Sequence, residues 1–313
     1  MTPTKTHSNQ LAEEVLQVFD DLNGPQPGFR PGHAKGILIA GRFTPSPAAA
    51  SLTRAPHIQR ASTPVTVRFS DATGIPAIPD NAPEASPRGM AVRFHLAEHV
   101  HTDIISHSVD GFPVRTAEEF LEFLTAARDS GPSVVSPKPI EVFLGAHPAA
   151  LAFVQAPKPA PASFTGETFY AVNAYRFTNQ KGIGRYGRYR IRPEGPSRYL
   201  DTEAAARQAP DFLFDEIKSA LDKGPRKMRI AVQLAENGDV TGDSTAHWPA
   251  GRPEVDFGTV ELISVLPNQE AEQRHIIFDP IPRVDGIDPS DDPLLEPRAA
   301  IYLMSGRRRR TGR

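Results

Sequence analysis

The stretch FRPGHAKGILIAGRF, residues 29–43, joins a stiff loop to a segment of strand composition. His33 stands in the loop half, three residues after Arg30 and among proline and glycine residues. An imidazole titrates at about pH 6.5, so it can take up and release protons near neutral pH. A loop of this composition would hold the ring still, so His33 is a candidate for a chemical role that needs a fixed imidazole.

Polar residues alternate with apolar ones in PVTVRFS, residues 64–70. In a strand, Thr66, Arg68 and Ser70 would point to one face, and the valine and phenylalanine side chains to the other. Two interpretations of this polar face are open. Either it faces water on the outside of the sheet, or it lines a cavity with Arg68 and Ser70 two residues apart on one wall.

Arg298 and Tyr302 are four residues apart in a segment with helical signals, so they would lie on one face of that helix. A guanidinium beside a phenol stabilises the phenolate, because a nearby opposite charge favours the charged form. A tyrosine with its ordinary pKa of about 10 would need such help to act as an anionic ligand near neutral pH. Taken alone, an Arg–Tyr pair on a helix is almost always structural.

Periodicity and capping signals predict the elements that position these residues. Helices are expected at 9–22, at 116–131, after the connector SPKPIEV, near 211–223 and from Asp292, with Pro293 at its first position. Pro297 is expected to kink or restart this last helix. Strands are expected at KGILIAGRF, PVTVRFS, GMAVRFHL, TDIISHS, FYAVNAYRF, RYGRYRIR, RKMRIAVQLAE and FGTVELISVL.

This order of elements predicts an α+β chain built on an antiparallel β-barrel with inserted and C-terminal helices. We expect one domain over residues 1–313. Residues 1–24 would form an N-terminal helix, 25–285 a barrel with helical insertions, and 286–313 a terminal helix with a basic tail. The arginine run at 307–310 is interpreted as a mainly solvated tail.

The composition excludes several classes of protein. A net charge of −2 argues against a nucleic-acid partner. The absence of cysteine excludes disulfides, thiolate metal sites and iron–sulfur clusters. We expect no membrane span and no signal peptide, because no run of about 18 apolar residues occurs and the first residues lack an apolar core. A cytoplasmic location is the expectation.

Five blocks, in chain order, resemble the haem catalases. They are HAKG (33–36), TPVTVRFSDATG (63–74), SPRGMAVRF (86–94), FYAVNAYRF (169–177) and the terminal Arg-x-x-x-Tyr helix. GIDPSDDPLLEPRAAIY (286–302) and the short length are most similar to the small catalase-related peroxidases. The resemblance extends over residues 29–309, nearly the whole chain.

The resemblance implies a haem b cofactor, with Tyr302 as the iron ligand and Arg298 holding its phenolate. It makes His33 the distal acid–base residue and Ser70 the residue that orients its ring. Further haem contacts are implied for Arg30, Arg68 and Arg309 at the propionates, and for Phe112 and Phe120 near the macrocycle. Arg309 matches less well than the other two, because Gly306 is expected to interrupt the helix before it.

Three departures from the family pattern bear on activity. His107 stands where larger catalases carry a distal asparagine, and Gly32 replaces a valine before the catalytic histidine. An imidazole is bulkier than an amide and could carry a proton into the pocket, so His107 predicts a better peroxidase than catalase. The long C-terminal helical region of larger catalases is missing, and we therefore expect no nicotinamide cofactor.

The predicted function is a haem peroxidase that uses hydrogen peroxide or organic hydroperoxides together with an organic reductant, as a possible homo-oligomer. One alternative is a fatty-acid hydroperoxide isomerase of the allene oxide synthase type, as in a related barrel. Another is a non-catalytic haem-binding protein. The H-x-H at His99 and His101 could be a metal pair, but no third ligand is placed by sequence and a surface turn is preferred.

Overall fold

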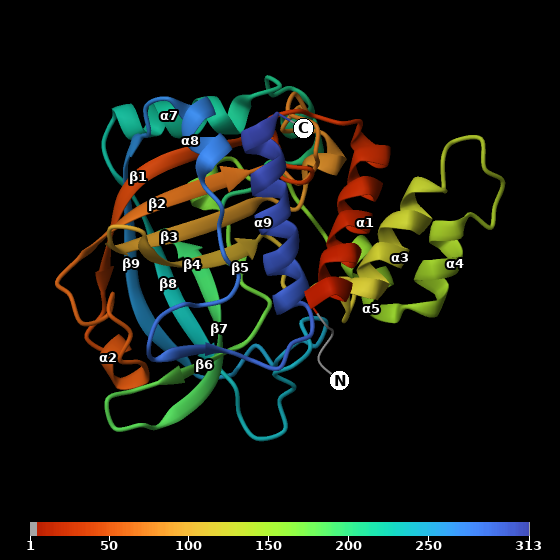
Figure 1. Ribbon diagram of the computed structural model, residues 1–313. Helices are drawn as coiled ribbons and strands as arrows, with labels where there is room; N and C mark the ends of the chain where they lie inside the picture. Colours follow the sequence, from red (N-terminus) through yellow and green to blue (C-terminus); the bar gives the residue numbers. More distant parts are fainter. Residues whose placement is uncertain (1–4, 313) are drawn as a thin grey trace.

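The computed structural model describes residues 5–312, so positions 1–4 of the expected N-terminal segment and residue 313 lie outside the described part. Within it, eight antiparallel strands close into a barrel, because β7 pairs with both β5 and β8. Around the barrel they are β1 (Gly36–Pro45), β2 (Thr63–Ser70), β3 (Gly89–Ala97), β4 (Val100–His107), β5 (Phe169–Tyr170), β7 (Gly184–Pro193), β8 (Arg226–Leu234) and β9 (Glu254–Val265). The predicted antiparallel barrel is confirmed (Figure 1).

Two short strands lie outside this ring. β6 (Tyr175–Thr178) pairs with the first half of β7, and β10 (Ile287–Pro289) pairs with β6. The single strand predicted for FYAVNAYRF is therefore wrong. Residues 171–174 leave the sheet between β5 and β6, and this break turns Asn173 toward the terminal helix.

The helices gather mainly on one side of the barrel. α9 (Leu295–Thr311) crosses the front of the barrel, α1 (Lys5–Asn23) packs beside it, and α3 (Ala117–Arg128), α4 (Pro139–Ala146) and α5 (Pro148–Gln155) extend beyond α1 (Figure 1). α7 (Phe212–Asp222) and α8 (Gln269–His275) cover one end of the barrel. Short turns complete the set: α2 (Ala49–Leu52), α6 (Thr202–Ala206), η1 (Pro83–Ala85) and η2 (Phe164–Gly166).

The α9 helix corrects three expectations. It begins at Leu295 rather than Pro293, although the Asp292 carboxylate accepts a hydrogen bond from the Leu294 N–H at 3.0 Å. Pro297 causes no kink, because it lies in the first turn, where a backbone N–H has no partner within the helix. The helix also continues through Gly306 to Thr311, so the basic run forms its last turns, with Arg307 and Arg310 exposed to solvent. Arg309 is only 3% exposed.

Both faces of β2 are buried, which corrects the interpretation of its polar face as exposed to water. Val65, Val67 and Phe69 belong to the apolar core inside the barrel. Arg68 and Ser70 point outward from the barrel, yet they are 4% and 3% exposed. The loop around His33 and α8 cover this face, since Arg68 donates to the His33 carbonyl and to Gln273.

The strand register places two residues of the expected site, Ser70 and His107, in one row with Gly89 between them. Ser70 pairs with Gly89 across β2 and β3, and Gly89 pairs with His107 across β3 and β4. A Cβ atom at position 89 would lie 2.5 Å from the Ser70 Oγ and 2.9 Å from the His33 Nδ1. Glycine at this position therefore leaves the space that the His33 ring occupies between its two neighbours.

We predict that Gly89→Ala displaces the His33 ring and destabilises the fold by about 1–3 kcal/mol, the usual cost of overpacking a tight site. Thermal or denaturant unfolding measures this change. The control is Gly145→Ala on α4, where nothing lies within 4 Å of the added Cβ, and where alanine should be neutral or stabilise the helix by about 0.5–1 kcal/mol. Equal stability of both variants would contradict the packing assigned to Gly89.

Candidate active site

His33 is held in a backbone conformation that few residues other than glycine adopt. Its φ angle is 56°, in the left-handed region. Two backbone hydrogen bonds fix this turn: the His33 N–H donates to Ala72 at 2.8 Å, and the Ala34 N–H donates to Thr73 at 2.9 Å. The ring Nδ1 lies 3.1 Å from the Ser70 Oγ. The structure thus brings His33 and Ser70 together, in a loop that cannot easily turn.

Burial and the neighbouring Arg68 guanidinium lower the pKa of His33 to about 4. The imidazole is therefore neutral at physiological pH and can accept a proton. A neutral ring has one N–H and one lone pair. If Nδ1 carries the hydrogen and donates to Ser70, the lone pair on Nε2 is free to act as a base.

His107 lies on the other side of Gly89, and its ring orientation is set by its own loop. The Val109 N–H donates to the His107 Nδ1 at 3.3 Å, so the hydrogen of the neutral ring is on Nε2. This Nε2 is buried and has no hydrogen-bond partner among the described residues. Burial, with smaller contributions from His33 and Arg298, lowers the pKa of His107 to about 3. The ring is thus neutral, with its hydrogen on Nε2, and its part in proton transfer stays a prediction.

Aromatic rings surround His107. Phe112 lies 6.5 Å from it and 5.5 Å from Phe120, between ring centroids, so the two predicted aromatics are neighbours. Phe153 of α5 approaches the same histidine edge-on at 6.2 Å. Phe153 was not anticipated, because an apolar helix far along the chain gives no sign of which side chain will reach the site.

Tyr302 is connected through Arg298 to a buried polar chain. The Arg298 guanidinium donates to the Tyr302 hydroxyl at 3.2 Å and to the Asn173 side-chain oxygen. The Asn173 amide donates to the Asp292 carboxylate at 2.8 Å. Burial acts to lower the pKa of Arg298, but Tyr302 and the nearby acidic groups raise it overall. Asn173 is a site residue that the sequence motifs do not predict, although it lies within FYAVNAYRF.

Arg30, Arg68 and Arg309 form a cluster of cations. Arg30 and Arg309 both donate to the Ile276 carbonyl, at 3.0 and 2.9 Å. Within residues 5–312, none of the three is close enough to a carboxylate to form an ion pair. Burial lowers all three pKa values, that of Arg68 to about 9 and that of Arg309 to about 10, and Arg30 is also affected by repulsion from the other two. Buried charges of this kind need an anion.

These groups fit a haem. A phenol held by a guanidinium suits ferric iron, and three unpaired guanidiniums suit carboxylates such as propionates. His107 Nε2 and Arg309 Nε are buried donors that have no hydrogen-bond partner among residues 5–312. By contrast, the described residues contain no group of three or more His, Asp or Glu side chains that could hold a bare metal ion.

Other sequence features lie away from this site. His99 lies in the turn between β3 and β4, and its side chain is 93% exposed. His101 lies in β4, where it pairs with His95, and its side chain is 34% exposed. The surface-turn interpretation therefore holds for His99 and is wrong for His101. No described helix is long and apolar enough to cross a membrane.

Comparison with known proteins agrees with this geometry. The catalase family model matches residues 8–313. A catalase-related peroxidase of Mycolicibacterium paratuberculosis is 33% identical over 296 residues, which cover 94% of this chain and 93% of that protein. One of Synechococcus elongatus is 30% identical, covering 96% of this chain and 89% of that protein.

Two solved structures share the fold. A fungal catalase superimposes with a TM-score of 0.80 at 22% identity, and catalase A of Saccharomyces cerevisiae with 0.80 at 21%. Each aligns over 91% of this chain but over only 59% and 62% of its own length. The family match over almost the whole chain, the two full-length relatives and the shared barrel together establish that the chain belongs to the catalase family.

Proposed function

We propose that the chain is a haem b peroxidase that reduces hydrogen peroxide or organic hydroperoxides at the expense of an organic reductant, with weak catalase activity. Membership of the catalase family makes it an oxidoreductase acting on peroxide and implies haem. The observation that carries the proposal is that one site combines a fixed neutral His33 with the Arg298-held phenol of Tyr302. The two relatives named catalase-related peroxidases support it.

In this proposal Tyr302 would bind the iron, and Arg298 would stabilise its phenolate. Arg30, Arg68 and Arg309 would pair with the propionates. Phe112 and Phe120 would pack near the macrocycle. Bound haem supplies the electrons and the redox chemistry that cleave the O–O bond of the peroxide.

The chain's own contribution is proton transfer and orientation. The free Nε2 of His33 takes the proton from one peroxide oxygen and returns it to the other, which leaves as water or an alcohol. Ser70 keeps the ring oriented through its contact with Nδ1. General acid–base help of this kind contributes about 10²–10⁴ in rate.

His107 would donate its Nε2 hydrogen to the bound peroxide. It offers one donor in a fixed direction, whereas an asparagine amide offers a donor and an acceptor in a smaller volume. Oxygen release requires a second peroxide in one specific pose. A bulky, donor-only group should disturb the placement of this second peroxide more than that of the first. The peroxidase activity should therefore exceed the catalase activity.

The two alternatives make different predictions. A non-catalytic haem-binding protein has no use for the strained His33 turn and its contact with Ser70. An isomerase would convert a fatty-acid hydroperoxide without consuming a reductant.

We further propose a cytoplasmic location and a possible homo-oligomer.

His33→Ala should retain haem but slow the reaction with peroxide by about two orders of magnitude or more. In the unmodified protein the reaction should persist as pH falls through 6.5 and decline only near pH 4, since the ring is a base only above its lowered pKa. Stopped-flow absorbance measures both effects. The control is His99→Ala in the exposed turn. Traces for His33→Ala that match the unmodified protein would exclude His33 as the acid–base residue.

His107→Asn should raise oxygen release from hydrogen peroxide relative to oxidation of a donor dye, because it restores a smaller side chain with an acceptor. An oxygen electrode run beside a dye assay on both proteins gives the ratio. If the unmodified enzyme already releases oxygen much faster than it oxidises the dye, the proposed preference for peroxidase activity is wrong.

A further inference from the structure

A buried ion pair joins the end of β2 to the start of β3, next to the residues that contact His33. Asp71 follows Ser70 and Arg88 precedes Gly89, and the two side chains are 0% and 1% exposed. The Arg88 guanidinium donates to the Asp71 carboxylate. The function proposed above gives this pair no role, although both of its members adjoin the site in the chain.

Arg88 also holds the loop between the two strands. It donates to the Ala85 carbonyl at 3.0 Å and to the Asp80 carbonyl. The same Ala85 carbonyl accepts from the Ala72 N–H at 3.0 Å, and the Ala72 carbonyl accepts from the His33 N–H at 2.8 Å. A continuous chain of hydrogen bonds therefore runs from Arg88 to the backbone of His33.

The backbone of Asp71 also contacts the His33 ring. Burial lowers the pKa of His33, and a hydrogen bond to the Asp71 backbone acts in the opposite direction. A hydrogen bond that favours the protonated ring has the carbonyl as its acceptor, since an N–H donor would favour the neutral ring. The ring nitrogen that faces Asp71 therefore carries a hydrogen.

This carbonyl can select the tautomer of His33, whereas Ser70 alone cannot. The Ser70 Oγ lies 3.1 Å from the His33 Nδ1, but a hydroxyl can donate or accept and so suits either form of the ring. A carbonyl only accepts. With Asp71 next to Ser70 in the chain, the nitrogen on this side is Nδ1, which leaves the lone pair on Nε2.

Lys35, two residues after His33, anchors the loop at its other end. Its ammonium nitrogen lies 2.6 Å from a carboxylate oxygen of Asp80 and 2.6 Å from one of Asp211. The Lys35 carbonyl accepts from the Asp71 N–H at 3.1 Å. The backbone of Asp71 is thus held by the loop that carries His33, and its side chain by the ion pair.

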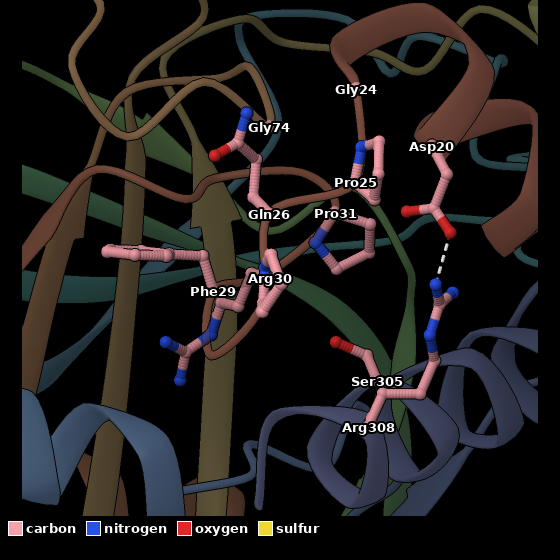
Figure 2. A pocket seen from close by; sticks show the side chains of 11 residues that line it. Asp20, Gly24, Pro25, Gln26, Phe29, Arg30, Pro31, Gly74, Ser305 and Arg308 are labelled. Atoms are coloured by element: carbon pink, nitrogen blue, oxygen red, sulfur yellow. Dashed lines mark hydrogen bonds and ion pairs between the residues drawn. The ribbon is translucent and has the colours of Figure 1, made fainter. Parts of the chain in front are cut away.

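The opposite flank leaves the loop little room to move. Figure 2 shows the small cavity between this loop and α9, which Pro31, Gly74 and Ser305 help to line. The volume of the cavity is about 30 Å³. A Cβ at position 74 would lie 2.2 Å from the Pro31 carbonyl oxygen, so the loop packs directly against the segment after β2. Because the loop is fixed, the direction of the Asp71 carbonyl decides which ring nitrogen carries the hydrogen.

We propose that Asp71 and Arg88 are positioning residues, which keep the hydrogen of the His33 ring on Nδ1 and so leave Nε2 as the base. The inference rests on the proposed function, in which this Nε2 takes the proton of the peroxide. Arg88 fixes the side chain of Asp71 and the loop behind it, and the Asp71 carbonyl is thereby directed at the ring.

The positioning depends on a hydrogen bond more than on charge. Burial raises the pKa of Asp71 to about 7, with Arg88 acting against this shift and the nearby Asp80 adding to it. A protonated carboxyl still has an oxygen that accepts from Arg88. Asp71→Asn keeps such an oxygen in the same place, whereas Asp71→Ala removes it, and the two variants form a matched pair.

The nitrogen-15 chemical shifts of the histidine rings report the tautomer directly. They are measured on the full-length protein, haem-free and loaded with diamagnetic zinc protoporphyrin, and the His33 signals are identified by their loss in His33→Ala. The unmodified protein should show a protonated Nδ1 and an unprotonated Nε2. In Asp71→Ala the two shifts should move toward each other, because both tautomers become populated, and Asp71→Asn should recover most of the difference.

The rate of the first reaction with peroxide gives an independent measure in the haem-loaded protein. A histidine in the wrong tautomer cannot accept the proton. Asp71→Ala should slow this reaction by about two- to tenfold, the factor that one lost hydrogen bond implies, and Asp71→Asn should recover most of it. If Asp71→Ala does not fold, Arg88→Lys tests the same link, because one ammonium group cannot replace the forked guanidinium at all its acceptors.

The matched control is Asp239→Ala. Asp239 lies in the loop between β8 and β9, its side chain is 7% exposed, and it accepts two hydrogen bonds from Arg252. Its loss should lower the stability of the protein without changing the His33 signals or the rate with peroxide.

Three outcomes would overturn the proposal: unchanged His33 signals in the folded Asp71 and Arg88 variants, an equal change in Asp239→Ala, or no recovery in Asp71→Asn. Each of them would leave the proposed function intact. A changed tautomer with an unchanged rate of reaction with peroxide would instead uphold the positioning role and refute His33 as the acid–base residue of the proposed function.

Discussion

The close approach of the His33 loop to the ends of β2 and β3 is the constraint on which the rest of the site depends. Gly89, between Ser70 and His107 in the sheet, has no Cβ, and this leaves room for the imidazole beside Ser70. The left-handed turn at His33 is strained, and backbone hydrogen bonds to the loop after β2 maintain it. The same turn exposes the His33 carbonyl to Arg68, so the acid–base residue and the cation cluster are positioned by one loop.

The cation cluster gives a physical reason for an anionic ligand at this site. Three buried or half-buried guanidiniums repel one another, and no carboxylate of the described chain neutralises them. Carbonyl oxygens such as that of Ile276 satisfy some of their N–H groups but carry no charge. An anionic ligand would remove the repulsion, which explains why a folded chain keeps such a cluster.

Much of the fold could be predicted from the sequence, because strand alternation and helix caps are local signals. The antiparallel barrel, the α3 cap at Thr116 and the α7 helix follow from them. The predictions fail where contacts between distant segments determine burial or end a strand. The polar face of β2 is buried because α8 and a distant loop cover it, and FYAVNAYRF breaks where Asn173 turns to Arg298.

The α9 helix illustrates a different error. Proline and glycine disfavour helix interiors on average, which predicts breaks at Pro297 and Gly306, but proline in a first turn sacrifices no hydrogen bond. Gly306 is buried, and a Cβ there would collide with the side chain of Ile277. For the site, motifs indicated His33, Ser70, Arg298 and Tyr302. Phe153 could not be predicted, because only the packing of α5 brings it to His107.

The central claim is that Tyr302, held by Arg298, binds the iron of a haem. The most direct test is the absorption spectrum of the haem-loaded protein, compared with that of Tyr302→Phe. The account predicts a tyrosinate-ligated ferric spectrum in the unmodified protein, and loss of most haem or a clearly shifted spectrum in the variant. An unchanged spectrum with full activity toward peroxide in Tyr302→Phe would contradict it.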